Sequence, residues 1–212
     1  MQVLLESIRV EMPDFYMPLL PFHLQRMFNS QMELWNKADV SNVEAQIRNS
    51  FQQEIGAENT KAFYKCRLLY HIEGIHAIEW QQYTERQIHT LRLTEADKLQ
   101  YHHKFADRQS IEHLKDNSAA DDILMHRNGL ITDISYANVA FFDGREWVSP
   151  EEPLLKGVKR ASLLEENAIR LSHIKTTDLV FFNRIMLFNA MTSAVFEYRF
   201  DEYHGILYLD KR

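Results

Sequence analysis

The sequence predicts an α+β fold in two lobes, and three features support this. Apolar residues recur with helical spacing after Pro21, whereas other stretches resemble strands joined by short turns. The dipeptides Glu73-Gly74, Asn128-Gly129 and Asp143-Gly144 are typical of turns between paired strands. The strands and helices do not alternate as regular βαβ units, so the pattern argues against a doubly wound sheet.

The first lobe combines strands with two amphipathic helices. Prolines at 13, 18 and 21 end the opening strand. One face of the helix that follows is predicted to carry Leu24, Met27, Phe28, Leu34 and Trp35. The predicted elements are a strand at 3–10, that helix, a helix at 43–51, a turn at 56–59, and hairpin strands at 62–71 and 75–83.

The second lobe is predicted to begin near residue 90, which divides the chain into an N-terminal α/β domain at 1–90 and a C-terminal domain at 91–212. Because Asp-Gly suits the positive φ angles of a type I′ turn, Asp143-Gly144 predicts a tight hairpin. The predicted elements are a connector at 90–93, a helix at 111–114, strands at 121–125, 138–142 and 147–148, a helix from about 160 to 171, and a buried strand at 179–182.

Composition restricts the class of protein. The chain has 212 residues, of which 45% are hydrophobic, so it is long enough to bury a core. A single cysteine, Cys66, excludes an intramolecular disulfide and fits a reducing compartment, so we expect a cytoplasmic location. No secretory pattern or membrane-spanning run is evident, so we expect no membrane association. A net charge of -6 argues against nucleic acid as a partner.

Several familiar chemistries have no matching motif in the sequence. It contains no glycine-rich dinucleotide loop, phosphate-binding P-loop, nucleophile elbow or zinc-protease helix. His102 and His103 form the densest histidine pair, but adjacent residues on a strand point to opposite faces. We therefore predict no metal site.

Four segments carry the remaining signal: His23-Leu24-Gln25-Arg26, residues 101–108, residues 128–138, and Leu154-Leu155-Lys156-Gly157-Val158-Lys159-Arg160. In this order they resemble the class IV aminotransferases, which include branched-chain and D-amino-acid aminotransferases and 4-amino-4-deoxychorismate lyase. The resemblance extends from Leu5 to Asn183. It implies pyridoxal 5′-phosphate as cofactor, a homodimer, and the D-amino-acid-aminotransferase-like fold, with a small α/β N-terminal domain and a barrel-like, cofactor-binding C-terminal domain.

By this resemblance, Lys104 is the catalytic lysine that carries the cofactor. A lysine reacts with an aldehyde only as the free amine, so its pKa must be lowered by burial or by a nearby cation. Arg108, four residues on, is expected to supply that positive charge. Taken alone, any lysine is more often solvated, and the prediction therefore depends on the other segments.

The resemblance assigns Asp133 to the pyridine nitrogen of the cofactor, where an acid keeps the ring protonated. The alternative is an ordinary turn residue after Gly129. The family generally has glutamate at this position, so the aspartate side chain here is shorter.

Gly157, Val158 and Lys159 are expected to bind the cofactor phosphate at a helix start. The competing interpretation is a plain helix entry. The family often has a threonine hydroxyl in this turn, and this sequence lacks one. Arg26 is expected to add charge at the phosphate, although an arginine on the polar side of a helix is often only solvated.

Three further residues complete the predicted site. Asn138 and Asn183 are expected to line the cofactor site or, alternatively, to cap strand ends. Arg67 lies on an otherwise apolar strand, where it either clamps a substrate carboxylate or points to solvent.

The sequence leaves three hypotheses for function. The first is a transaminase acting on an amino acid and keto acid pair. The second is a 4-amino-4-deoxychorismate lyase, which eliminates pyruvate from an aminodeoxychorismate-like substrate. The third is a non-catalytic, cofactor-free descendant that serves as a binding module.

Overall fold

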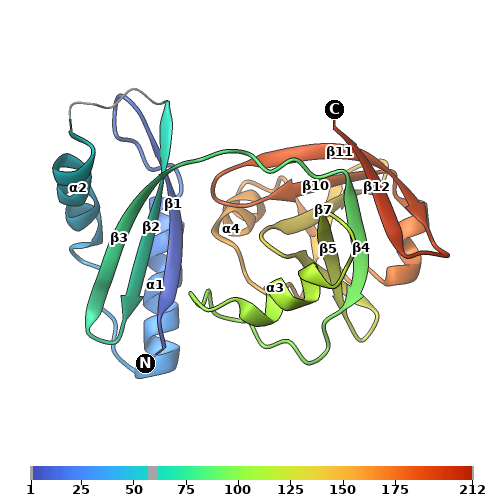
Figure 1. Cartoon of the computed structure of the whole chain (residues 1–212), viewed down its shortest axis with the longest axis horizontal. Coiled ribbons are helices and arrows are strands. Elements are labelled where there is room, and N and C mark those ends of the chain that lie inside the picture. The colour runs from blue at the N-terminus through green and yellow to red at the C-terminus, as the bar shows by residue number, and fades with distance from the viewer. Residues whose placement is uncertain (1, 57–61, 212) are drawn as a thin grey trace. The chain divides into compact units, whose positions relative to one another are not determined.

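Two compact units make up the computed structural model of the chain, which describes residues 2–56 and 62–211 (Figure 1). The first unit comprises the residues up to Thr84 together with His103–Asp107, and the second comprises Glu85–His102 and the chain from Arg108 onward. The boundary predicted near residue 90 did not include the return of the chain to the first unit at His103–Asp107. The short segment that carries Lys104 therefore belongs to the first unit.

The first unit is an antiparallel three-stranded sheet with two helices. The sheet order is β1-β2-β3. Its elements are β1 (Leu4–Glu11), α1 (Leu20–Trp35), α2 (Val43–Glu54), β2 (Phe63–His71) and β3 (Gly74–Gln82). Alternate residues of β2 are buried in the core, namely Tyr64, Cys66, Leu68 and Tyr70. These elements and the Glu73-Gly74 hairpin confirm the predictions, whereas the predicted turn at 56–59 lies mostly outside the described residues.

The buried face of α1 differs from the predicted one. Phe28 is 42% exposed, so its assignment to the apolar face was wrong. The buried positions follow helical spacing but include polar residues, and they are Leu20, His23, Met27, Ser30 and Gln31. Polar groups on this face have partners inside the unit, which a hydrophobic pattern cannot indicate.

In the second unit, seven strands of the described chain close into a barrel. The hydrogen-bonded order runs β10-β11-β12-β4-β5-β6-β7, and β7 pairs with β10 to complete the ring. These strands are β4 (Thr90–Glu95), β5 (Asp122–Arg127), β6 (Leu130–Ile134), β7 (Asn138–Phe142), β10 (Arg184–Phe188), β11 (Ser193–Asp201) and β12 (Ile206–Lys211). The barrel confirms the predicted α+β class with a barrel-like second lobe.

The remaining elements of the second unit lie outside this ring. They are α3 (Gln109–Asp116), β8 (Trp147–Pro150), α4 (Val158–Glu165), β9 (Arg170–Ser172) and the 3₁₀ helix η2 (Thr176–Phe181). β8 pairs with β7, and β9 pairs with β8. The buried core of the unit is apolar and draws on most of the barrel strands, with Leu91, Leu124, Val139 and Ile185 among its members.

Type I′ geometry occurs at a different turn from the predicted one. Asn128 and Gly129 both have positive φ angles, 49° and 76°, as a type I′ turn requires. Asp143 is not among the described residues with positive φ, so the type I′ prediction for Asp143-Gly144 was wrong. The Asp143 carboxylate instead accepts hydrogen bonds from the N–H groups of Arg145 and Glu146, which stabilises a longer loop.

Other predicted elements of the second unit also need correction. The predicted connector at 90–93 is strand β4, which pairs with both β5 and β12. The predicted helix at 160–171 is the shorter α4, because Asn167 adopts a left-handed conformation and the chain then forms β9. The predicted strand at 179–182 is mostly the 3₁₀ helix η2. Strands β10, β11 and β12 were not predicted.

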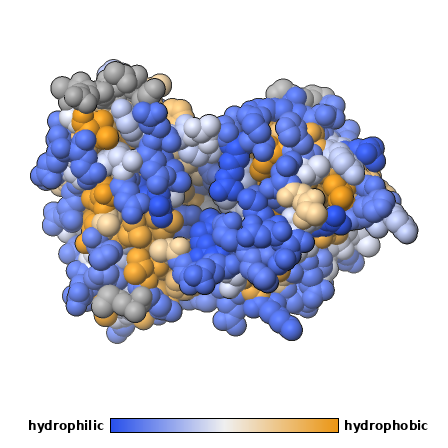
Figure 2. All heavy atoms as spheres, viewed as in Figure 1, coloured by the Kyte–Doolittle hydropathy of each residue, from blue (hydrophilic) through white to orange (hydrophobic). Residues whose placement is uncertain are grey.

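The surface of the first unit exposes more apolar side chains than that of the second in the view of Figure 2. Among the larger apolar residues of α1, Phe28 and Met32 are exposed. Across the described ranges, every helix is too short or too polar to cross a membrane.

Candidate active site

Asp133 and Asn138 form a cross-strand pair between β6 and β7. The turn between them is closed by the N–H of Ile134, which donates to the C=O of Ala137. Cross-strand partners project from the same face of a sheet, and both side chains are buried, with exposed fractions of 4% and 7%. Asn138 Nδ2 donates to Asp133 Oδ1 over 2.6 Å. The structure therefore brings two predicted site residues into direct contact.

The backbone of Leu155 completes this arrangement. Its N–H donates to Asp133 Oδ2 over 2.9 Å, and its C=O accepts a hydrogen bond from Asn138 Nδ2 over 2.8 Å. Three hydrogen bonds thus form a closed ring among Asp133, Asn138 and Leu155. The ring ties the acid to the segment that leads into α4.

Burial controls the charge of Asp133. It raises the pKa of Asp133 to about 7, although the hydrogen bonds from Leu155 and Asn138 and the positive charge of Arg160 act in the opposite direction. A carboxylate has about four acceptor positions, and these hydrogen bonds use two of them. Asp133 can therefore accept a further proton-bearing group.

Gly157 is the N-cap of α4 and has an extended backbone, with φ of -71° and ψ of 149°. A Cβ atom at this position would lie 2.0 Å from Asn138 Oδ1, so the glycine is needed because the amide approaches so closely. The first turn of α4 contains no acidic residue, and no side chain caps it. Since the first N–H groups of a helix lack intrahelical partners, the backbone of Val158 and Lys159 suits an anion such as a phosphate.

Arg160 is a buried arginine that the sequence prediction did not include in the site. Its Nη2 donates to the C=O of Pro150 over 2.9 Å, while its Nε has no hydrogen-bond partner in the described chain. Burial lowers its pKa, and the negative charge of Asp133 raises it. Arg160 therefore acts on Asp133 as a nearby charge.

Lys104 lies in the segment of the first unit that runs along β1. The N–H of Leu5 donates to the C=O of Lys104 over 2.9 Å, and the N–H of Ala106 donates to the C=O of Val3 over 2.9 Å. The side chain of Lys104 is half-buried. Its backbone is therefore held at the edge of a sheet, while the catalytic role of its amine stays a prediction.

Arg26 pairs with a buried acid on β1. Its Nε donates to Glu6 Oε1 over 2.9 Å, and its Nη2 makes a second contact with Glu6 Oε2. Burial alone would raise the pKa of Glu6, but the charge of Arg26 and the hydrogen bonds from His23 and Arg26 lower it to about 2. Glu6 is therefore an anion at neutral pH, and it holds Arg26 in place.

His23 is the third member of this cluster. Its Nδ1 lies 2.6 Å from Glu6 Oε2, and because Glu6 is an anion this nitrogen must be the donor. Burial lowers the pKa of His23, and the charges of Arg26 and Lys104 lower it further, whereas Glu6 opposes them. The ring is therefore neutral, and the charge of Lys104 acts on it.

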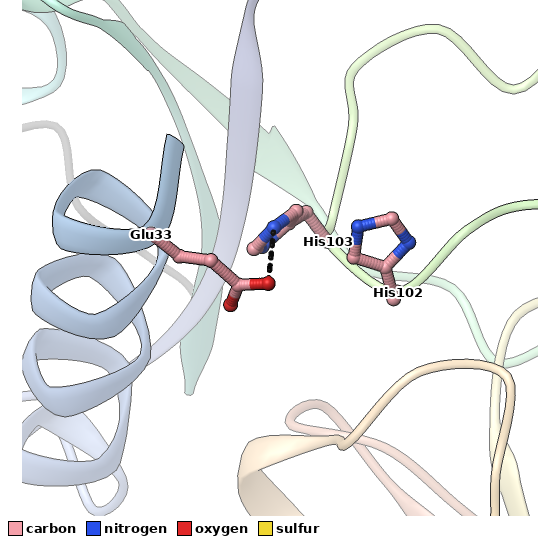
Figure 3. Close-up of side chains that lie close together, drawn as sticks. All are labelled: Glu33, His102 and His103. Atoms are coloured by element: carbon pink, nitrogen blue, oxygen red, sulfur yellow. Dashed lines mark ion pairs between the residues drawn. The ribbon is translucent and has the colours of Figure 1, made fainter. Parts of the chain in front are cut away.

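His103, the residue before Lys104, is buried and contacts α1. Its Nδ1 lies 3.2 Å from Ser30 Oγ, and its Nε2 lies 3.6 Å from a carboxylate oxygen of Glu33 (Figure 3). Figure 3 also draws His102, the preceding residue. Both histidines lie in a bend and not in a strand, so the strand-based argument against a metal does not apply. The absence of a metal stays a prediction.

Three predicted site residues have other contacts in the structure. Arg108 belongs to the second unit, where its Nη2 donates to the C=O of Ser135 over 2.6 Å. Arg67 lies on the half-exposed face of β2 and pairs with Glu79 at 3.0 Å. Asn183 is exposed, and its C=O accepts a hydrogen bond from the N–H of Tyr198. Their roles toward a cofactor or substrate stay predictions.

Glu6 and His23 were not included in the predicted site, although each carried a signal. Glu6 alternates with the apolar residues Leu4, Ile8 and Val10, so it faces the core of the sheet. An acid at such a position indicates a buried partner, because an unpaired buried charge is too costly. His23 lies three residues before Arg26, on neighbouring turns of the same helix.

A known family matches most of this chain. The family described as "Amino-transferase class IV" matches residues 3–196. An uncharacterised protein of Haemophilus influenzae is 34% identical over 128 residues, which are 60% of this chain and 68% of that protein.

Solved structures show the same fold. A proposed 4-amino-4-deoxychorismate lyase of Haemophilus somnus is 27% identical with a TM-score of 0.78, covering 90% of this chain and 96% of the other. A proposed amino-acid aminotransferase of Mesorhizobium loti is 23% identical with a TM-score of 0.76 and the same coverage.

Replacing Glu6 should strongly destabilise the first unit. Glu6→Gln removes the charge that pairs with Arg26, so we expect the free energy of unfolding at pH 7 to fall by about 3 kcal/mol. Because the pKa of Glu6 is lowered from 4.5 to about 2, its contribution in the wild type is present above pH 4.5 and is lost as the pH falls toward 2. Urea denaturation at several pH values measures both effects.

The matched control is Glu44→Gln, which removes an exposed pair with Arg48 on α2. It should change the free energy by less than about 0.5 kcal/mol. Equal losses in the two variants would contradict a special role for Glu6.

Asp133 should give the cofactor-free protein an unusual pH dependence. Its pKa is raised from 3.8 to about 7, so its contribution to stability is present below pH 3.8 and is lost as the pH rises through 7. Between pH 5 and pH 8, the wild type should lose roughly 2–3 kcal/mol relative to Asp133→Asn. Urea denaturation of both proteins tests this, with Glu152→Gln as an exposed control. Parallel pH profiles for wild type and Asp133→Asn would refute the expectation.

Proposed function

Because this chain belongs to the class IV aminotransferase family, and is a transaminase or lyase of this pyridoxal-phosphate-dependent group, we propose that it is an aminotransferase acting on an amino acid and keto acid pair. The observation that carries the proposal is the buried Asp133 carboxylate, hydrogen-bonded to the turn that begins α4. One structural unit thus combines an acid suited to a pyridine nitrogen with backbone donors suited to a phosphate.

The residues of the second unit fit pyridoxal 5′-phosphate. Asp133 is buried and retains acceptor capacity, as a partner of a protonated ring nitrogen must. Gly157 has no side chain to block the N-terminus of α4, and the first turn of that helix is free of acidic residues that would repel a phosphate. The missing threonine hydroxyl therefore leaves the backbone donors as the main phosphate contacts.

Bound pyridoxal 5′-phosphate supplies an aldehyde that reacts with amines and a ring that accepts an electron pair. In our proposal, the Lys104 amine would hold the cofactor aldehyde until the substrate amine displaces it. The freed Nζ would then take the proton from the α-carbon of the substrate and deliver it to the cofactor carbon that carried the aldehyde. Asp133 holds a proton at the ring nitrogen, and the N–H groups of Val158 and Lys159 bind the phosphate. The predicted role of Arg26 at the phosphate stays a proposal, since its guanidinium already pairs with the Glu6 carboxylate.

A second candidate function is 4-amino-4-deoxychorismate lyase. The proposed lyase of Haemophilus somnus has both a higher identity and a higher TM-score than the proposed aminotransferase of Mesorhizobium loti. The same lysine, acid and phosphate turn would serve an elimination that releases pyruvate.

Product analysis separates the two reactions. A transaminase should form keto acid from an amino acid only when a second keto acid is present as acceptor. A lyase should instead release pyruvate from aminodeoxychorismate without any acceptor. Pyruvate release under the second condition, together with no transfer from a panel of amino acids, would replace the transaminase proposal by the lyase.

Lys104 should be indispensable in either case. Lys104→Ala removes the amine that carries the cofactor and moves the proton, so turnover should fall at least about 100-fold. Wild type mixed with pyridoxal 5′-phosphate should turn yellow, and borohydride should fix the cofactor to Lys104, as mass spectrometry of the peptides would show. Fixation at another lysine, or an equally active Lys104→Ala variant, would refute the assignment. Lys115→Ala, on α3, is the control.

A further inference from the structure

We propose that Asn138 is a positioning residue that couples the Asp133 carboxylate to the 154–157 turn, so that the acid and the phosphate-binding turn adopt one geometry together. The inference rests on the proposed function and extends it. It assigns to Asn138 a role exerted through its neighbours and not through contact with the cofactor. Three observations support it.

First, the orientation of the Asn138 amide is determined by its partners. Its Nδ2 donates to Asp133 Oδ1 over 2.6 Å and to the C=O of Leu155 over 2.8 Å. An amide nitrogen has two hydrogens, so both are used. The reverse orientation would place the amide oxygen against two acceptor oxygens, which is unfavourable in a buried site. Asn138 can therefore hold both partners in only one way.

Second, Gly157 leaves room for the oxygen end of the same amide. A Cβ atom at residue 157 would lie 2.0 Å from Asn138 Oδ1 and 3.2 Å from its Cγ. The amide thus lies between the carboxylate on one side and the N-cap of α4 on the other. A shift of the turn must therefore move the amide, and the amide is hydrogen-bonded to the Asp133 carboxylate.

Third, the backbone of Asn138 is anchored on two sides. Asn138 pairs with Asp133 on β6 and with Phe188 on β10, the strand that closes the barrel. The side chain therefore projects from a rigid position. A donor held at a rigid position fixes the distance between the two groups that it bridges.

A simpler role for Asn138 would be to satisfy the buried Asp133 alone. In that case its loss would affect the acid but not the phosphate turn. Coupling makes a different prediction, because the turn would also lose its support. A ligand that binds the turn but has no pyridine ring distinguishes the two roles. Inorganic phosphate is such a ligand.

The experiment measures binding of inorganic phosphate by calorimetry and of pyridoxal 5′-phosphate by absorbance to the cofactor-free protein. The variants are Asn138→Asp, which keeps the shape but replaces the amide by a carboxyl group, and Asn138→Ser, which shortens the side chain without adding an ionisable group. We expect both ligands to bind at least about tenfold more weakly to each variant. Asn29→Asp, the same change at an exposed position of α1, should bind both ligands as wild type does.

A double-mutant cycle provides a readout that a merely structural role would not change. If Asn138 acts through Asp133 and the turn together, the loss of phosphate affinity caused by Asn138→Ser should become smaller in an Asp133→Asn background. Melting temperatures show that each variant is folded. Should Asn138→Asp fail to fold, Asn138→Ser in the same cycle decides the question.

Two results would overturn the inference, and they differ in what else they affect. Phosphate affinity within about twofold of wild type in both Asn138 variants, with weakened pyridoxal 5′-phosphate binding, would limit Asn138 to the acid and leave the proposed function intact. Failure of the wild type to bind either ligand would overturn the proposed function as well.

Discussion

The burial of the Asp133 carboxylate is the constraint around which the second unit arranges its site. Removing a carboxylate from water is unfavourable unless hydrogen bonds replace the lost hydration. Asn138 and Leu155 provide these bonds, and the position of the Asn138 amide explains why a glycine precedes α4. The acid therefore organises the local backbone as well as the chemistry.

The pKa values of the two buried acids, one in each unit, are shifted in opposite directions. Glu6 contacts the Arg26 cation and has a pKa of about 2, so it stays ionised and serves to orient the arginine. Asp133 is held by neutral donors, and its pKa is about 7, so it can gain or lose a proton near neutral pH. The difference arises from contact with a cation, since both acids are fully buried.

Backbone pairing holds both halves of the predicted machinery in place. The Lys104 segment is bonded to β1 through Leu5 and through Ala106, and Asn138 is anchored between β6 and β10. Groups on paired strands lose little further freedom when a ligand binds, which favours precise positioning. Lys104 and Asn138 thus each belong to a backbone segment that is hydrogen-bonded to a sheet of its own unit.

The sequence by itself determined many of the local elements and the residue types of the predicted site. Periodicity predicted α2, the Asp143-Gly144 hairpin signal predicted β7, and the Asn128-Gly129 dipeptide predicted a turn. The family resemblance implied the roles of Lys104, Asp133 and Gly157, which stay predictions. Only the tertiary structure decided the closure of the barrel, the partners of Glu6, and the contact between Asn138 and Gly157. The reason is physical: propensity and periodicity act over a few neighbouring residues, whereas strand pairing and burial join positions far apart in the chain.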